Sequence, residues 1–188
     1  MELLFDDEWI DRKAGVRRVP GPVNKEPEPI LKPEMPWETA GIGGTSVIFD
    51  QEDDRFKLWY RSSAVETVVR KRNESVESSE RETGTRRVFL CYAESKDGIS
   101  WARPSLGMYE FQGNRDNNIL RELSFEGDGV FSNVIKDPRD PDPARRYRAL
   151  GFDSSATSSV QGAQSGTRGV CVSYSPDGFR WEDPKLIM

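Results

Sequence analysis

A seven-residue pattern that occurs twice constrains the fold of this chain more than any other feature of the sequence. The pattern is Ser-x-Asp-Gly-x-x-Trp, and it stands at residues 95–101 and 175–181. Its two tryptophans, Trp101 and Trp181, lie 80 residues apart, and each copy follows an apolar run and precedes a proline. A strand, a turn and a tryptophan that recur in this way predict an array of small β-sheets.

Three strand-like segments precede the pattern in each copy. In the first copy the segment 55–61 alternates polar and apolar side chains with the period of two that is typical of a strand. The full sets are 45–49, 55–61 and 87–93 in the first copy, and 134–136, 146–150 and 169–173 in the second. Cys91 and Cys171 hold the same position in the third segment. We predict that both are small buried residues, because equivalent positions on neighbouring sheets are too far apart for a disulfide.

These segments predict an all-β fold of four-stranded antiparallel units, with the fourth strand of the first unit near residues 107–111. A four-stranded antiparallel meander is a blade of a β-propeller, and propellers use four to eight blades. We predict an extended N-terminal arm rich in proline, a first blade with an exposed insertion, and a second blade followed by the start of a third. Their boundaries are 1–36 for the arm, 37–111 for the first blade, 62–86 for its insertion, and 112–188 for the remainder. Two blades cannot close a ring, so we expect the chain to be the N-terminal part of a larger propeller.

Composition excludes several classes of function. The chain has no histidine, which excludes Ser-His-Asp and Cys-His catalysis within it. Its net charge of −5, without a basic stripe, argues against binding of nucleic acid. No apolar run is long enough to span a membrane, and the N-terminus lacks the pattern of a signal peptide. Reduced cysteines and the absence of a signal favour the cytoplasm.

The repeated pattern itself predicts a structural turn. Serine and aspartate side chains accept hydrogen bonds from backbone N–H groups in a turn, and glycine adopts positive φ. The tryptophan would fold back over the hairpin. We therefore interpret Asp97 and Asp177 as turn residues, since an active site rarely duplicates its acid in every repeat.

The order of these motifs resembles the five-bladed β-propeller glycoside hydrolases of families 32 and 43, the group of invertase, levansucrase and arabinanase. The resemblance rests on Pro-Ile-Leu at 29–31, Trp-Glu at 37–38, Phe-x-Leu-Trp-Tyr at 56–60 and the run from Cys91 to Trp101. It covers nearly the whole chain as about two blades of five. It implies a carbohydrate substrate and three carboxylates at the centre of the ring, one on each of several blades, acting as nucleophile or base, as acid and as stabiliser.

Candidate site residues follow from the expected position of these carboxylates before the first strand of each blade. The chain lacks the family's Asp-Pro motifs there, having Gly43-Gly44-Thr45 in the first blade and Phe131-Ser132-Asn133 in the second. The remaining candidates for catalysis are Glu38, Glu126 and Asp128, and the candidates for substrate contact are Trp37 and Asn133. No cofactor is predicted, although the acidic run 6–8 could hold Ca²⁺.

Three functions remain open from the sequence. The leading hypothesis is a glycosidase that uses carboxylate acid–base chemistry. The alternative is a carbohydrate-binding propeller without the catalytic triad, which the missing Asp-Pro motifs favour. A protein-interaction propeller would need a large apolar outer face, and the sequence shows none.

Overall fold

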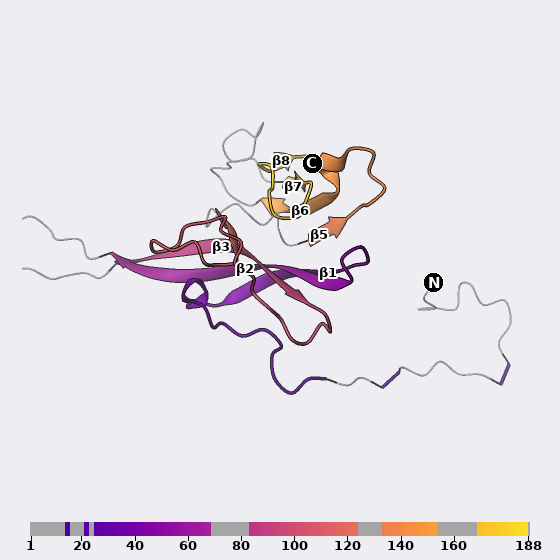
Figure 1. Cartoon of the computed structure of the whole chain (residues 1–188), viewed down its shortest axis with the longest axis horizontal. Helices are drawn as coiled ribbons and strands as arrows, with labels where there is room; N and C mark the ends of the chain where they lie inside the picture. The colour runs from indigo at the N-terminus through magenta and orange to yellow at the C-terminus, as the bar shows by residue number, and fades with distance from the viewer. Residues whose placement is uncertain are drawn as a thin grey trace, which may run out of the picture.

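The protein is all-β, built from two four-stranded antiparallel sheets (Figure 1). The computed structural model describes residues 14–15, 21–22, 25–68, 83–123, 133–153 and 169–187. In both sheets, strands that follow one another in the chain are neighbours, so each sheet is an up-and-down meander. The only helices within these ranges are two single 3₁₀ turns, η1 (Pro36–Glu38) and η3 (Pro143–Arg145).

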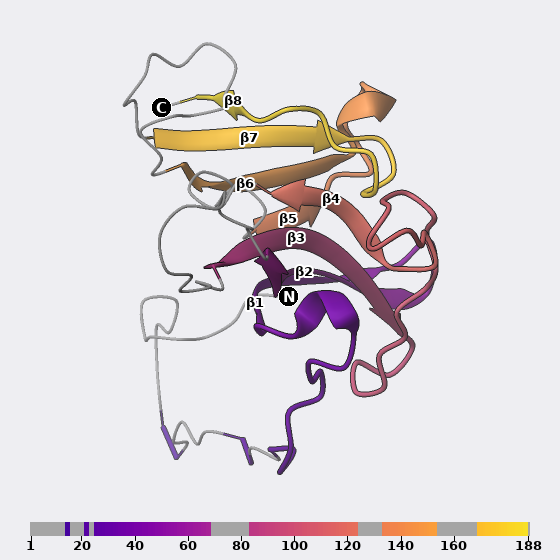
Figure 2. The same ribbon diagram turned by 90° about the vertical axis from the view of Figure 1, so that its left-hand side faces the viewer.

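The first sheet contains β1 (Ile42–Asp50), β2 (Arg55–Val68), β3 (Thr83–Ser95) and β4 (Ile119–Leu123). Its second and third strands pair continuously from Phe56–Ser95 to Val68–Thr83, which makes a long hairpin. The second sheet contains β5 (Asn133–Lys136), β6 (Tyr147–Asp153), β7 (Gly169–Ser175) and β8 (Lys185–Leu186). Figure 2 shows the two sheets one above the other.

The strand registers show that the two sheets are copies of one unit. Tyr60 pairs with Cys91 in the first sheet, and Gly151 pairs with Cys171 in the second. Phe56 pairs with Ser95, and Tyr147 pairs with Ser175. Serine and cysteine therefore stand at the same places in both third strands. Both cysteines are free and buried, as predicted.

The core between the sheets is formed by one face of each. Trp59, Leu90 and Tyr92 from the first sheet pack with Val134, Tyr147, Ala149 and Cys171 from the second. A separate cluster covers the other face of the first sheet, where Trp37 and Phe111 pack onto β2 and β3. The first strands of the two sheets are also joined by hydrogen bonds, because the Ser46 hydroxyl accepts from Val134 N (2.8 Å) and donates to Val134 O (3.2 Å).

The Ser-x-Asp-Gly-x-x-Trp pattern is a structural turn, as predicted. Asp97 Oδ1 accepts hydrogen bonds from the N–H groups of Ile99 (2.8 Å) and Ser100 (2.7 Å), and Gly98 has φ +74°. Trp101 folds back to donate from its indole to Gly98 O (3.2 Å). The second copy repeats this arrangement, with Asp177 bonded to the N–H groups of Phe179 and Arg180, Gly178 at φ +79° and Trp181 bonded to Gly178 O.

The second turn also joins the sheets. Trp59 on β2 donates from its indole to Gly178 O at 2.7 Å. A Cβ atom at Gly178 would lie 2.8 Å from the Trp59 ring, so only glycine permits this approach. The turn therefore closes its own hairpin and packs against the neighbouring unit.

Two predictions about the first unit were wrong. The fourth strand is Ile119–Leu123 rather than 107–111, because Ile119 pairs with Cys91, while Phe111 forms only an isolated bridge to Asn114. Ile119 and Leu120 therefore belong to the first sheet, although the predicted boundary at residue 112 assigned them to the second blade. The exposed insertion predicted at 62–86 also begins later, since β2 continues to Val68 and β3 starts at Thr83, with Ser62, Ser63 and Ala64 buried. Residues 69–82 lie outside the described residues.

Candidate binding site on the first strand

An open pocket of about 370 Å³ lies beside the start of β1. Its wall is the segment 40–44, and its other sides come from β2 and β3. The lining residues are Ala40, Gly41, Ile42, Gly43, Gly44, Arg61, Ser62, Ser63, Arg86 and Val88. A volume of this size suits a small ligand or one or two sugar rings.

Glycines and a break in the strand register shape the wall. The pairing of β1 with β2 shifts between Gly43 and Ser46, so the strand bulges where it borders the pocket. Gly44 has φ +57°, a conformation that favours glycine. Beside Gly43 no atom lies within 4 Å of where a side chain would start, so this position opens into free space.

Arg61 crosses the bulge. A Cβ atom at Gly44 would lie 3.0 Å from Arg61 Cδ, so the arginine stem lies directly over this glycine. Across the described residues, the Arg61 guanidinium has no hydrogen-bond or ion-pair partner. The side chain is half-buried. A half-buried guanidinium has five N–H donors, and those of Arg61 remain for a ligand.

Arg86, on β3, also lines the pocket and is held in place by β2. Its Nη2 donates to Ser63 Oγ at 2.9 Å, and Ser63 Oγ donates to Gly41 O at 3.4 Å. The backbone of Ser63 also pairs with the wall, donating to Gly41 O (3.0 Å) and accepting from Ala40 N (2.8 Å). The wall and this arginine are therefore fixed to the same residue of β2.

Glu38, one of the predicted catalytic carboxylates, is fully buried next to this wall. Its Oε1 accepts from Tyr60 OH (2.6 Å) and Arg103 Nε (3.0 Å). Its Oε2 accepts from Arg103 Nη2 (3.1 Å) and from the N–H groups of Glu34 (2.9 Å) and Met35 (3.2 Å). Five donors occupy the carboxylate, so the geometry favours a structural role over the catalytic one predicted from the sequence.

Trp37, the predicted sugar contact beside Glu38, is also a core residue. Its indole donates to Asn118 Oδ1 (2.9 Å), and its ring packs edge-on against Phe111. Asn118 Nδ2 donates in turn to Tyr60 OH (2.7 Å), which donates to Glu38. Trp37, Asn118, Tyr60 and Glu38 therefore form one buried chain of hydrogen bonds. These hydrogen bonds fix η1 onto the sheet, and with it the pocket wall that follows η1 in the sequence.

Burial raises the pKa of two groups in or beside this series of hydrogen bonds, Tyr60 and Cys91. It raises the pKa of the Tyr60 hydroxyl far above its ordinary value, with further increases from Cys91 and Glu38. It also raises the pKa of the Cys91 thiol, which lies 3.2 Å from Ser62 Oγ. Tyr60 therefore remains a proton donor to Glu38, and Cys91 remains a thiol rather than a nucleophile.

The other predicted site residues are not brought together with Glu38. Asn133 is an exposed residue at the start of β5, paired with Leu150, and it does not line the pocket. Glu126 and Asp128 lie outside the described residues, as does the acidic run 6–8. Among the residues that the structure does describe, no group of three or more Asp, Glu, Cys or His side chains could hold a metal ion.

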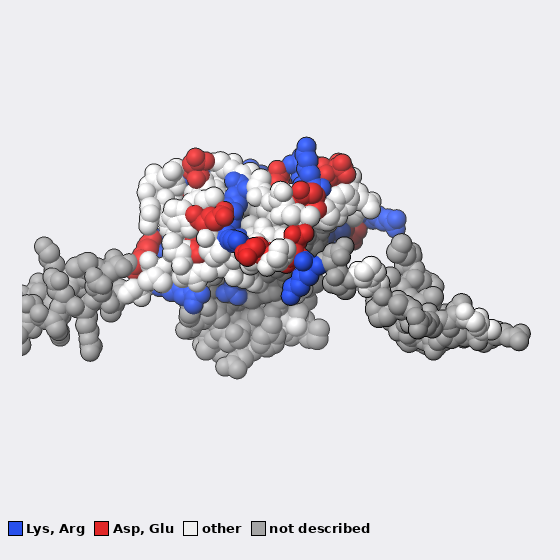
Figure 3. All heavy atoms as spheres, turned by 90° about the horizontal axis from the view of Figure 1, so that it is seen from below, with Lys and Arg blue, Asp and Glu red and all other residues white. Residues whose placement is uncertain are grey.

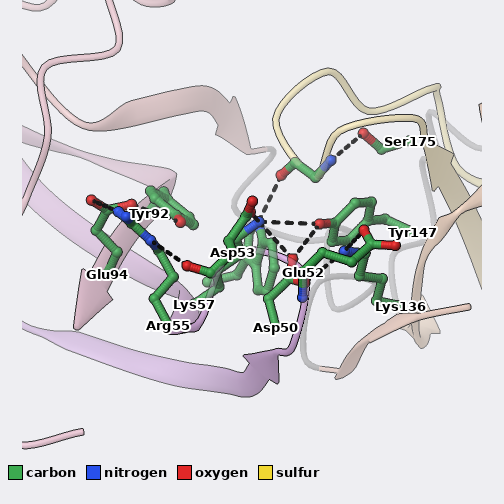
Figure 4. A network of polar contacts seen from close by, with 12 residues as sticks. Asp50, Glu52, Asp53, Arg55, Lys57, Tyr92, Glu94, Lys136, Tyr147 and Ser175 are labelled. Atoms are coloured by element: carbon green, nitrogen blue, oxygen red, sulfur yellow. Dashed lines mark hydrogen bonds and ion pairs between the residues drawn. The ribbon is translucent and has the colours of Figure 1, made fainter. Parts of the chain in front are cut away.

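A second polar cluster lies between the sheets, and the sequence did not predict it (Figure 4). Asp50, nearly fully buried at the end of β1, accepts from Lys57 (2.7 Å), Lys136 (2.6 Å) and Tyr147 (3.0 Å). Burial alone would raise the pKa of Asp50, but these hydrogen bonds outweigh it and hold the pKa well below its usual range. Burial would lower the pKa of Lys57, and its bonds to Asp50, Asp53 and Tyr147 raise it instead.

This cluster is a repeated feature of the hairpin between the first two strands. In the second sheet, Arg148 takes the place of Lys57 and forms ion pairs with Asp137 and Asp140, as Lys57 does with Asp50 and Asp53. Asp137 lies at the turn after β5, in the place that Asp50 takes at the end of β1. A charged pair that recurs in both units indicates a structural clamp rather than a catalytic group.

Comparison of the sequence with protein families and with curated proteins gives no relative from which to transfer a function. No protein-family description matches the sequence, and no curated protein matches it.

No helix in the described part of the chain is long and apolar enough to cross a membrane. On the face seen in Figure 3, acidic and basic side chains are interspersed, without a continuous basic stripe.

Proposed function

We propose that this chain contributes two neighbouring blades to a carbohydrate-binding β-propeller, similar to the family 32 and 43 glycoside hydrolases, and that the pocket beside β1 binds the sugar. The observation that carries the proposal is the pocket itself. It lies at the start of the first strand of the first unit, where the resemblance implies the sugar-binding funnel.

The arrangement of the units supports the propeller. Both are four-stranded meanders of the same register, and their first strands are joined by Ser46 and Val134. One face of the first unit packs on the opposite face of the second, which is how successive blades are arranged around an axis.

The chemistry of the pocket supports binding rather than hydrolysis. Its lining contains two arginines, two serines and no carboxylate among the described residues. Glycoside hydrolysis needs two carboxylates across the scissile bond. Glu38, the predicted catalytic acid that lies next to the pocket wall, already accepts hydrogen bonds from Arg103 and Tyr60.

A substitution that fills the pocket tests the proposal. Gly43→Leu points a side chain into the free space beside the wall, whereas Gly21→Leu adds the same side chain at another open position away from the pocket. On a glycan array, we expect the unmodified chain and Gly21→Leu to bind the same sugars and Gly43→Leu to lose at least tenfold in affinity. Failure of the unmodified chain to bind any glycan, or equal binding by all three proteins, would overturn the proposal.

Hydrolysis is a second candidate, because Glu126 and Asp128 stand between β4 and β5, directly before the first strand of the second unit. In the family that the sequence resembles, catalytic carboxylates precede such strands. The test is turnover of aryl glycosides and oligosaccharides by the chain and by Glu38→Gln, Glu126→Gln and Asp128→Asn. If turnover is present and all three variants retain it, the predicted catalytic residues are wrong.

A further inference from the structure

We infer that the pocket beside β1 binds an acidic sugar, with the carboxylate or sulfate group of the ligand on the Arg61 guanidinium. The inference rests on the proposed function and names the chemistry of the ligand.

The charge of the pocket is the first support. Arg61 and Arg86 both line it, and no carboxylate among the described residues joins them there. Unlike Arg61, seven arginines of the described part form ion pairs with carboxylates: Arg55, Arg87, Arg103, Arg115, Arg121, Arg148 and Arg180. The unpaired, half-buried guanidinium of Arg61 favours an anion in this pocket, and its partial burial strengthens the attraction.

The position of Arg61 is the second support. Its stem packs against Gly44, where a Cβ atom would lie 3.0 Å from Arg61 Cδ. A packed stem loses less entropy when a ligand binds than a fully solvated one. Its planar guanidinium matches a carboxylate or a sulfate through two parallel hydrogen bonds. Ser63 and Arg86, which are joined to each other, also line the pocket.

The net charge of the chain favours a single anionic group over a polyanion such as nucleic acid. That charge is −5, and the face seen in Figure 3 carries mixed charges rather than a basic track. A long polyanion needs many phosphate contacts along such a track. An acidic sugar that places one carboxylate or sulfate group in the pocket needs only Arg61.

The experiment measures binding by isothermal titration with matched probes and the purified chain. The carboxylate arm compares a galacturonate tetrasaccharide with its methyl ester, which keeps the sugar and removes the charge. The sulfate arm compares a sulfated galactan tetrasaccharide with the unsulfated one. The variants are Arg61→Gln, which removes the charge, Arg61→Lys, which keeps it, and the control Arg115→Gln in an exposed loop.

In at least one arm, we expect the charged probe to bind at least tenfold more tightly than its neutral partner, and less tightly at high salt. Arg61→Gln should weaken this binding about ten- to a hundredfold, as expected for loss of a charged hydrogen-bond donor. Arg61→Lys should fall between that variant and the unmodified chain, and Arg115→Gln should bind normally. The melting temperature of each variant shows that it is folded.

Two results would overturn the inference, and they differ in what they mean for the proposed function. If the neutral probes bind as well as the charged ones and Gly43→Leu abolishes that binding while Arg61→Gln does not, the pocket binds sugars without recognising a charge. In that case the inference fails and the proposed function stands. If no probe binds in either arm and the glycan array is also blank, both fail.

Discussion

Glu38 illustrates how much a residue's role depends on partners that are remote in the sequence. Its position before the first strand of the first unit predicted a catalytic carboxylate. The structure instead pairs it with Arg103, 65 positions later, and both side chains are nearly or fully buried. A buried pair of this kind is costly to break, because the remaining partner keeps its charge without compensation.

Replacement of Glu38 by alanine should therefore destabilise the protein by about 3–5 kcal/mol, the usual range when one partner of a buried pair is lost. Urea denaturation measures this change. The matched control is Glu28→Ala, which removes a carboxylate from an exposed pair with Lys32 and should cost under about 1 kcal/mol. Equal midpoints for the two variants would show that the Glu38 pair does not stabilise the fold.

Gly178 provides a second test at the residue scale. Gly178→Ala must accommodate a Cβ atom 2.8 Å from the Trp59 ring and also keep φ at +79°, whereas Gly107→Ala has φ +65° but free space around it. Both variants are destabilised by positive φ, so the difference in their unfolding free energies reports the contact with the Trp59 ring alone. We expect Gly178→Ala to be about 1–3 kcal/mol less stable than Gly107→Ala, from the cost of overpacking. Similar unfolding free energies for the two would contradict the contact described here.

At the scale of the element, the features that could be predicted from the sequence are those whose interacting residues lie close together along the chain. The Ser-x-Asp-Gly-x-x-Trp turn was predictable because its donors, acceptors and glycine lie within seven residues. The alternation in β2 likewise indicated a strand. The fourth strand was not predictable, since Ile119 becomes a strand residue only by pairing with Cys91 across a long loop. The pocket was missed for the same reason: Arg61 and Arg86 are distant in sequence and meet only through the β2–β3 hairpin.

The turns should make the stability of the protein depend on acidic pH. The N–H groups of Ser100 and Ile99 and the Ser95 hydroxyl lower the pKa of Asp97 below its ordinary value. Burial opposes the shift at Asp177, but N–H groups of Arg180 and Phe179 outweigh it and lower that pKa as well. A carboxylate with a lowered folded-state pKa adds stability that is present above the unfolded value of about 3.9 and is lost below it.

We therefore expect the double variant Asp97→Asn, Asp177→Asn to be less stable than the unmodified chain at pH 7, with the gap shrinking as the pH falls from about 4 toward 2. Chemical denaturation at a series of pH values measures the gap. Asp116→Asn in an exposed loop serves as the control. A gap that stays constant down to pH 2 would mean that the turn carboxylates do not act through their charge.

At the scale of the whole molecule, comparison of the two units identifies apolar positions that are buried between the sheets in one unit and exposed in the other. Val134 is buried against the first sheet, while its counterpart Val47 is 50% exposed on the outer face of that sheet. Ile48 packs into the core between the sheets, while its counterpart Ile135 is 44% exposed. Phe49, beside Val47, is exposed as well. The face of each sheet that points away from the other sheet thus exposes apolar side chains at positions whose counterparts are buried between the sheets.

These apolar side chains should limit the solubility of the purified 188-residue chain. The triple variant Val47→Lys, Phe49→Lys, Ile135→Lys should remain monomeric at higher concentration, as measured by light scattering, with a melting temperature close to that of the unmodified chain. A control with lysine at three exposed neutral polar positions, Gln51, Ser105 and Gln112, changes the charge by the same amount and so separates the loss of apolar surface from the change in charge. Equal solubility of the two triple variants would show that the apolar faces are not responsible.

The hydrogen bond from Trp59 to Gly178 makes one indole a reporter of the junction between the sheets. The donor belongs to the first sheet and the acceptor to the second, and the ring is completely shielded from solvent. Its N–H proton can exchange with deuterium only when the two sheets separate, whether or not each sheet keeps its own strands paired. Comparing that exchange rate with those of backbone amides inside β2 and β7 would distinguish opening at the junction from unfolding of either unit.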